Sequence, residues 1–379
     1  MRPGQSSGGT NVYAHLASAG SKGMFHAAIG LSGSPNISMP QAVKEAQDTE
    51  MWLPRTPCAN VSEHAEQLLH CLQTADAGEL LRSIPPKYEV FTFADKYDYP
   101  VNKVGLRTTV ATLVHVDGVT ITDPLEESLR RGLHSDVPII FQSTQAEMDC
   151  YPIPSLVGAS REQLHKFWDN SFSPAVFGSE MSSAVAAHYS NYTAIDPEYA
   201  VYAVDADTAS TCGLLALSRA AAAGLKSPVY LATVTGAPSA AFSRSCSGMA
   251  GGMNTSRFPF HNWDLASAAA VYAGDKSCAA TSADYTFGVH VKRSWMALIE
   301  GGSLEGVGGW CRFRSGAGSA TDASVVNADS DSAPSSTVEG LECSTVLELT
   351  GAKAVRRLKT DVCAWWERQG IGRNWWWIN

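Results

Sequence analysis

Short apolar runs and helical segments follow one another along the chain. Three runs lack the apolar–polar alternation of a half-exposed strand, so they predict buried strands. These runs are 27–31, 137–141 and 228–232. Helices are predicted at 10–18, 63–74 and 207–223. Helices that succeed strands in this way favour an α/β domain with a mostly parallel sheet.

The last part of the chain begins with a segment that offers little to bury. Residues 315–338 are small, polar and partly acidic, which predicts a long solvated surface loop. A final strand is expected at 345–349, and a closing helix with Trp365 and Trp366 at 353–368. We find neither an internal repeat nor a clear domain boundary, so we interpret residues 1–379 as a single domain.

Composition and charge exclude several classes of protein. Of the 379 residues, 45% are hydrophobic and 17% are charged, which excludes an intrinsically disordered chain. The net charge is 28 − 37 = −9, and neither nucleic acid nor an anionic membrane surface selects an acidic protein. No run of 18 apolar residues occurs, so we expect no transmembrane segment.

The turn Gly4-Gln5-Ser6-Ser7-Gly8 matches the pattern G-x-S-x-G. In this pattern a serine nucleophile occupies a strained turn between a strand and a helix, and the flanking glycines permit close backbone approach. The helix N-terminus favours developing negative charge, and the amide of Ser7 is a candidate oxyanion-hole donor. The alternative is a flexible N-terminal tail, because short matches of this kind also arise by chance.

The neighbours of this turn extend the match. From Gly4 to Asn36 the chain resembles the nucleophile region of type-B carboxylesterases and cholinesterases, with the family patterns G-E-S-A-G-G, H-L, S-x-G-L-F-x-x-A-I and Q-S-G-S. Their counterparts here are 4–9, 15–16, 21–29 and 32–34. Later family motifs correspond to 116–118, 137–147, Asp207 with Cys212, 258–265, Trp295, Trp310 and 363–365. The resemblance covers nearly the whole chain and is weakest across 315–338.

The resemblance implies an α/β-hydrolase fold, a mostly parallel sheet with helices on both faces. It also implies a serine carboxylester hydrolase that acts on small-molecule esters through an acyl-enzyme intermediate, with no metal and no organic cofactor. Ser6 is then the nucleophile, Glu147 the acid and His261 the base. The chain order Ser…Glu…His is that of α/β-hydrolases, and a serine hydroxyl needs such a base at neutral pH.

Several alternatives stay open at this stage. Asp149 is the rival acid, because it lies two residues from Glu147. His115 and His134 are rivals for the base. Asp264 is interpreted as a supporting group that is hydrogen-bonded to Ser32.

Two positions depart from the family pattern. Gln5 replaces the family's glutamate, which removes an anion beside Ser6. Cys150 replaces an aromatic residue that choline-binding members use, and quaternary ammonium groups prefer aromatic faces. A broad carboxylester specificity is therefore favoured over choline esters.

The chain has nine cysteines. The resemblance implies the disulfides Cys58–Cys71 and Cys212–Cys363. Cys246 and Cys278 flank His261 and form a weaker candidate pair, whereas the pairing of Cys150, Cys311 and Cys343 is open. Together with the sequons at Asn36, Asn60, Asn191 and Asn254, the cysteines favour the secretory route, although no signal peptide is found. The alternative is a cytosolic chain with reduced cysteines.

The resemblance also bears on what precedes Ser6. Family members carry a long upstream segment with central strands and a loop that supplies further oxyanion amides. Residues 1–5 are expected to be too few for the strand that presents Ser6, so we interpret the chain as lacking the N-terminal strands. On this hypothesis the chain alone is poorly soluble and nearly inactive.

Other functions remain possible on the same fold. The runner-up is a catalytically inactive esterase-like adhesion module, against which the three filled triad positions count. A thioesterase or amidase would use the same triad. The sequence leaves the oligomeric state open.

Overall fold

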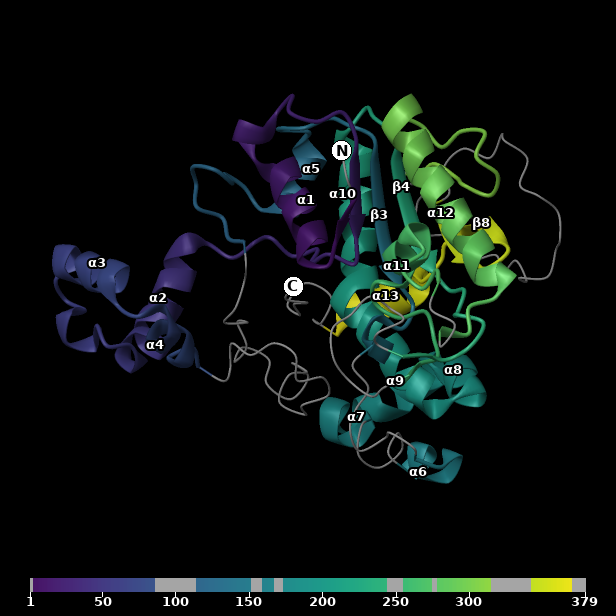
Figure 1. Cartoon of the computed structure of the whole chain (residues 1–379), viewed down its shortest axis with the longest axis horizontal. Helices are drawn as coiled ribbons and strands as arrows, with labels where there is room; N and C mark the ends of the chain where they lie inside the picture. Colours follow the sequence, from purple (N-terminus) through teal and green to yellow (C-terminus); the bar gives the residue numbers. More distant parts are fainter. Residues whose placement is uncertain are drawn as a thin grey trace.

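A six-stranded sheet with helices on both faces forms the centre of the protein (Figure 1). The computed structural model describes residues 3–85, 114–150, 159–166, 173–243, 255–274, 278–314 and 342–369. The expected surface loop at 315–338 lies outside these ranges. The sheet and its two covering layers confirm the predicted α/β class.

The strand order places the carboxyl ends of the parallel strands along one edge of the sheet. The order is β1-β2-β3-β4-β7-β8, and the neighbouring pairs from β1 to β7 are parallel. The strands are β1 (Gly4–Gln5), β2 (Ala28–Leu31), β3 (Ile139–Thr144), β4 (Val229–Val234), β7 (Cys343–Glu348) and β8 (Gly351–Arg356). Such an edge is where α/β folds bind ligands.

The expectation that no strand could form before Ser6 is wrong in the structure. Gly4 and Gln5 pair in parallel with Gly30 and Leu31 and form the two-residue strand β1. Pairing with β2 on one side defines these two residues as a strand, because β2 offers backbone groups for their hydrogen bonds on that side.

Buried strand residues point alternately into two apolar layers. On one face, Ala28, Phe141 and Leu231 pack with helices α1 (Ser7–Ala17), α5 (Leu125–Arg131), α10 (Cys212–Gly224) and α13 (Thr360–Arg368). On the other face, Ile29, Ile140 and Tyr230 pack against α11 (Trp263–Ala269) and α12 (Ser282–Gly301). Burial on both sides explains why these strands appear in the sequence as continuous apolar runs.

Further helices lie beyond the carboxyl edge of the sheet (Figure 1). They are α6 (Arg161–Lys166), α7 (Ser173–His188), α8 (Ser190–Ile195) and α9 (Pro197–Ala206). Helix α9 continues through a π-helical segment, Asp207–Thr211, into α10, so the predicted helix at 207–223 begins with this segment. A small antiparallel pair joins β5 (Phe242–Ser243) to β6 (Thr255–Ser256).

The predicted closing helix at 353–368 is wrong in its first part. Residues 351–356 form β8, an antiparallel partner for the whole length of β7, and α13 begins only at Thr360. Lys359 adopts a left-handed conformation (φ 60°), which separates strand from helix. Pairing with β7 overrides the helical preference of this alanine-, lysine- and arginine-rich segment, because local propensity is a weak signal compared with tertiary contacts.

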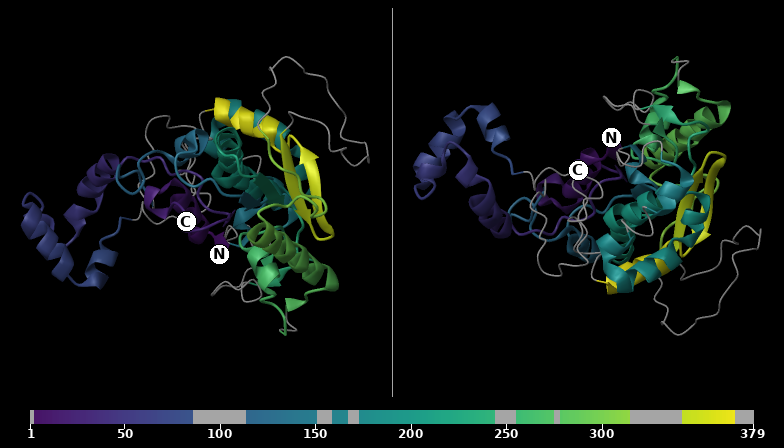
Figure 2. Two further views of the ribbon diagram at one scale, coloured as in Figure 1. Left: turned by 90° about the horizontal axis from the view of Figure 1, so that it is seen from above. Right: turned by 90° about the horizontal axis from the view of Figure 1, so that it is seen from below.

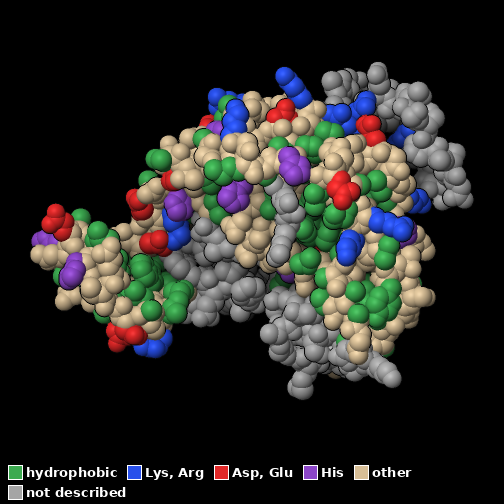
Figure 3. Space-filling view, turned by 45° about the horizontal axis from the view of Figure 1, so that its top comes forward, with side chains coloured by type: hydrophobic (Ala, Val, Ile, Leu, Met, Phe, Trp, Pro, Cys, Tyr) green, Lys and Arg blue, Asp and Glu red, His purple; other side chains and the backbone are tan. Residues whose placement is uncertain are grey.

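Three helices form an outlying group to one side of the sheet (Figures 1 and 2). We call residues 41–83 the helical group; it contains α2 (Gln41–Met51), α3 (Ala65–Thr74) and α4 (Ala77–Arg82). None of these three helices has a buried residue. Figure 3 shows apolar side chains at its surface, and Leu69 and Leu81 are more than half exposed.

Disulfides join several of these elements. Both expected pairs are present: Cys58–Cys71 in the helical group and Cys212–Cys363 between α10 and α13, with Cα–Cα distances of 5.8 and 5.1 Å. Cys311 and Cys343, which the sequence left open, form a further disulfide. Cys278 is disulfide-bonded, whereas its expected partner Cys246 lies outside the described residues.

Candidate active site

Ser6 occupies a strained turn between β1 and α1. Its backbone has φ 60° and ψ −127°, a left-handed conformation that L-residues rarely adopt. A Cβ added at Gly4 would lie 2.2 Å from the carbonyl oxygen of Gly8, so this position requires glycine. A Cβ at Gly8 would meet open space. Of the two flanking glycines, only Gly4 is therefore required by close backbone approach.

The two neighbours of Ser6, Gln5 and Ser7, lie at the end of β1 and at the start of α1. Ser7 is the exposed first residue of α1, and its amide lies at the helix N-terminus. Gln5 is the last residue of β1 and pairs with Leu31. The buried side-chain nitrogen of Gln5 finds no hydrogen-bond partner in the described part of the chain. This position therefore offers an unused donor, whereas the family pattern has a carboxylate.

Glu147 and His261 meet in a buried contact. Glu147 begins the 3₁₀ turn that follows β3, and its Oε2 lies 2.6 Å from His261 Nδ1. The other oxygen, Oε1, accepts a hydrogen bond from the amide of Thr144 at 2.7 Å. Glu147 is 0% exposed and His261 is 4% exposed. The carboxylate is thus fixed at both oxygens and orients the imidazole ring.

Backbone pairing brings these two residues together, although they are 114 positions apart. Ala146 and Phe260 form an isolated parallel bridge. The amide of Ala146 donates to Pro259 O at 3.0 Å, and the amide of His261 donates to Glu147 O at 2.9 Å. We call residues 256–261 the histidine segment; it lies along the turn that carries Glu147.

The register of the sheet places Ser6 at the same edge. Leu31 of β2 pairs with Gln5 on one side and with Gln142 of β3 on the other. The amide of Ser6 donates to Leu31 O at 2.9 Å, which continues the ladder by one residue. Because β1, β2 and β3 are parallel, Ser6 and the turn after β3 both lie at the carboxyl edge.

Asp264 and Ser32 are linked through Gln142, a residue that the sequence gave no reason to select. Gln142 donates from its side-chain amide to Asp264 at 2.5 Å, and the backbone carbonyl oxygen of Gln142 accepts from the amide of Ser32 at 2.7 Å. Asp264 also accepts from the amide of Leu265 at 2.7 Å. Burial raises the pKa of Asp264 to about 6, against these hydrogen bonds, which lower it.

Asp149, the rival acid, is turned toward the backbone of the histidine segment. Its Oδ2 accepts hydrogen bonds from the amides of Arg257 and Phe258 at 2.5 and 2.6 Å. Burial raises the pKa of Asp149 to about 7, while the two backbone hydrogen bonds lower it. The carboxylate that lies against His261 Nδ1 is that of Glu147.

The rival bases lie elsewhere. His134 is at the surface, with its Nε2 3.4 Å from Thr122 Oγ1. His115 precedes Val116, which forms an isolated bridge with Pro40. The side chain of Cys150 lies outside the described residues.

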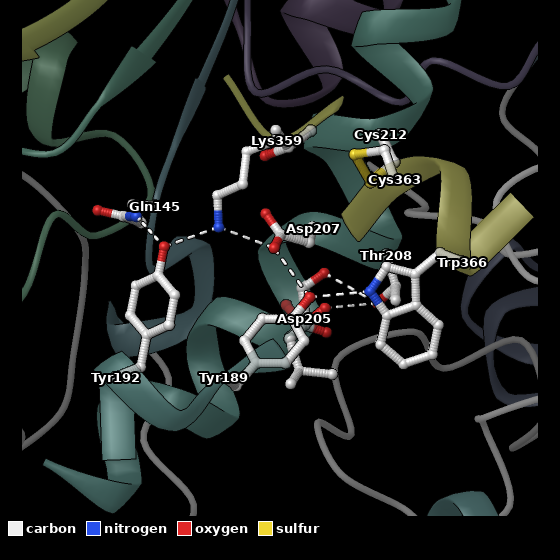
Figure 4. Close-up of polar contacts among 12 residues, drawn as sticks. Gln145, Tyr189, Tyr192, Asp205, Asp207, Thr208, Cys212, Lys359, Cys363 and Trp366 are labelled. Atoms are coloured by element: carbon white, nitrogen blue, oxygen red, sulfur yellow. Dashed lines mark hydrogen bonds and ion pairs between the residues drawn. A yellow bond between two sulfur atoms is a disulfide. The ribbon is translucent and has the colours of Figure 1, made fainter. Parts of the chain in front are cut away.

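A partly buried polar network begins at Gln145, two residues before Glu147 (Figure 4). Gln145 donates to the hydroxyl of Tyr192 at 2.5 Å and accepts from Tyr199 at 2.8 Å. Lys359 donates to Tyr192 and to Asp207, both at 2.8 Å. Burial, the largest single influence, lowers the pKa of Lys359, but the charge of Asp207 and the contacts with Asp207 and Tyr192 together raise it, and the net shift is upward. The sequence offered no signal for Lys359, because its partners are distant along the chain.

Other kinds of site find little support. Among the residues that the structure describes, no group of three His, Cys, Asp or Glu side chains could hold a metal ion. In the same ranges, no helix is both long enough and apolar enough to cross a membrane.

Comparisons with known proteins identify the family and the fold. The model of the carboxylesterase family matches residues 3–302. Among solved structures, the chain is similar to a PNB esterase, with 17% sequence identity and a TM-score of 0.57. The match covers 96% of this chain and 62% of that chain, and it shows a shared fold. A search of curated proteins found no match. Because the family model covers most of its residues, the chain belongs to the carboxylesterase family.

Proposed function

We propose that the protein is a serine carboxylester hydrolase that acts on small-molecule carboxylic esters. The observation that carries this proposal is the 2.6 Å contact between Glu147 and His261 at the sheet edge where Ser6 occupies its strained turn. Family membership supports the same reaction class.

The proposed reaction begins with attack of Ser6 Oγ on the ester carbonyl carbon. His261 accepts the hydroxyl proton at Nε2, because its Nδ1 is directed to Glu147. The amide of Ser7, at the N-terminus of α1, donates to the oxyanion of the tetrahedral intermediate. Collapse of this intermediate breaks the ester bond, and His261 delivers the proton to the leaving alcohol. Water then attacks the acyl carbon while His261 accepts its proton. The bond to Ser6 Oγ breaks, His261 returns the proton to Ser6, and the carboxylic acid is released.

Glu147 has two roles in this scheme. Its hydrogen bond holds the imidazole in the tautomer that carries the proton on Nδ1, and its charge stabilises the imidazolium that forms. Complete burial of the carboxylate strengthens both effects, because water does not screen the interaction.

Specificity is proposed to be broad. Gln5 replaces an anion beside Ser6 with a neutral amide, and Cys150 replaces an aromatic ring. Without the ring, a quaternary ammonium group loses a cation–π partner, so esters with uncharged alcohols are the favoured substrates.

Labelling with a fluorophosphonate probe tests the nucleophile directly. We expect the wild-type chain to form an adduct at Ser6, and Ser6→Ala to abolish labelling and to lower hydrolysis of a short-chain p-nitrophenyl ester by several orders of magnitude. Ser190→Ala, which removes an exposed hydroxyl, is the matched control and should label normally. Wild-type hydrolysis rates in Ser6→Ala would refute the assignment, and absence of any adduct would favour the adhesion module.

We also propose that the protein enters the secretory pathway. Three described disulfides and the exposed sequon asparagines Asn60 and Asn191 support this proposal. Endoglycosidase treatment of protein from a eukaryotic host should lower its mass, and an unchanged mass would count against glycosylation.

A further inference from the structure

Two buried carboxylates, Glu147 and Asp149, extend from one 3₁₀ turn. Glu147 contacts the imidazole of His261, whereas Asp149 contacts only backbone amides of the histidine segment among its described side-chain hydrogen bonds. Asp149 is 1% exposed. Burial of a carboxylate costs free energy unless the group is hydrogen-bonded, so the contacts of Asp149 are expected to explain its position.

The contacts of Asp149 join the turn to the segment that ends at His261. One oxygen, Oδ2, accepts from two consecutive amides, those of Arg257 and Phe258. The hydroxyl of Ser256 donates to Asp149 O at 3.4 Å, and the amide of Asp149 donates to Ala146 O at 2.9 Å. A buried backbone amide that loses its acceptor costs the full desolvation penalty of the group, so these contacts hold the segment in place.

The same segment is also held on its outer side. The guanidinium of Arg257 pairs with Asp196 at 3.2 Å and with Glu198 of α9. The ring of Phe258 stacks on Tyr199 of α9, with centroids 4.4 Å apart. The charges of Glu198 and Arg257 therefore act on Asp149, in addition to Glu147 on its own turn.

We propose that Asp149 is a positioning residue that fixes the histidine segment against the Glu147 turn and thereby sets the place of the His261 ring. This inference rests on the proposed function, in which His261 must reach both Ser6 and Glu147. Only two residues, Pro259 and Phe260, separate Phe258 from His261. A displacement of the segment by about 1 Å would therefore move the base, and such a misplacement costs on the order of 10² in rate.

Two nearly isosteric variants separate the acceptor from the shape of the side chain. Asp149→Leu removes both acceptor oxygens and leaves two buried amides unpaired, whereas Asp149→Asn keeps one acceptor oxygen for them. We expect Asp149→Leu to lower kcat about 10²-fold with KM little changed. We expect Asp149→Asn to recover kcat to within about tenfold of wild type.

The split between kcat and KM, together with the recovery in Asp149→Asn, separates a positioning role from general destabilisation. Asp284→Asn is the matched control. Asp284 is also buried and accepts backbone amides, but at the start of α12. This variant should keep the wild-type kcat and KM.

Hydrogen exchange tests the clamp without any need for turnover. The amides of Arg257 and Phe258 should be protected in the wild-type protein and in Asp149→Asn, and should exchange at least tenfold faster in Asp149→Leu. If Asp149→Leu does not fold, Asp149→Ala gives the same comparison. Unprotected amides in the wild type, or a folded acceptor-free variant with unchanged kcat, would overturn the inference. Absence of Ser6 labelling would refute the proposed function alone.

Discussion

The sheet with its carboxyl edge and the helical group are stabilised in different ways. The sheet is covered on both faces by large apolar clusters, and Glu147, Asp149 and His261 at its carboxyl edge are almost completely buried. In the helical group, α2, α3 and α4 have no buried residue. The buried apolar side chains Leu53 and Cys58 lie in the segment that connects α2 to α3. One chain thus contains a region with an extensive core and a region nearly without one.

The helical group compensates with covalent and polar links. Cys58 and Cys71 are joined by a disulfide, and Arg55 and Ser83 exchange hydrogen bonds of 3.0 and 2.9 Å. Small units that bury little apolar surface commonly depend on such links. Apolar burial thus fixes the elements of the sheet, whereas specific bonds fix those of the helical group. The candidate active site uses both.

Removal of the Glu147 charge should produce the largest effect. In Glu147→Gln the amide keeps the side-chain shape but no longer stabilises the imidazolium, so kcat should fall about 10⁴-fold. Steady-state ester hydrolysis measures this loss. Glu127→Gln, a partly exposed surface variant, should leave kcat unchanged. If Glu147→Gln hydrolysed esters at the wild-type rate, Glu147 would not be the orienting acid.

Removal of the Cys58–Cys71 disulfide should affect only the helical group. Closure of this loop, with a sequence separation of 13, contributes about 3 kcal/mol in the chain-entropy model. In Cys58→Ala/Cys71→Ala, amides of α3 should therefore exchange faster, while kcat stays at the wild-type value. Leu69→Gln, at an exposed position, should change stability by less than about 0.5 kcal/mol. A large loss of kcat in the cysteine variant would show that the two regions are coupled.

The ionisation of Asp149 should produce the smallest of these effects, a dependence of the unfolding free energy on pH with a definite sign. Its pKa is raised to about 7 in the folded protein by burial, above the ordinary value of 3.8. The folded state therefore holds this proton more tightly than the unfolded state, and the contribution of Asp149 to stability falls as pH rises toward 7.

Urea unfolding of wild type and Asp149→Asn measures this contribution. Between pH 5 and 6, the unfolding free energy of wild type relative to Asp149→Asn should fall by about 1.4 kcal/mol per pH unit, and by about half as much per unit near pH 7. The difference should become constant above the pKa. A difference that does not change with pH over this range would show that the carboxyl is ionised throughout.

Local sequence patterns predicted the buried strands and the strained serine turn. The runs at 27–31, 137–141 and 228–232 became β2, β3 and β4, because strands buried on both faces need apolar residues at every position. The turn at Ser6 was recognisable because Gly4 and the following helix are local requirements. The segment 353–356 was predicted wrongly, because its strand structure depends on pairing with β7.

Local sequence patterns indicated which residues are chemically competent: a serine in a glycine-rich turn, two acidic candidates after a buried strand, and a histidine in a family-like segment. Contacts between distant segments establish that Glu147 lies against His261 and that Asp149 accepts from backbone amides. Such contacts also pair Cys311 with Cys343 and Lys359 with Asp207. The reason is physical. Residues two apart on one turn have nearly identical local sequence contexts, and their partners are chosen by backbone pairing between segments more than one hundred residues apart.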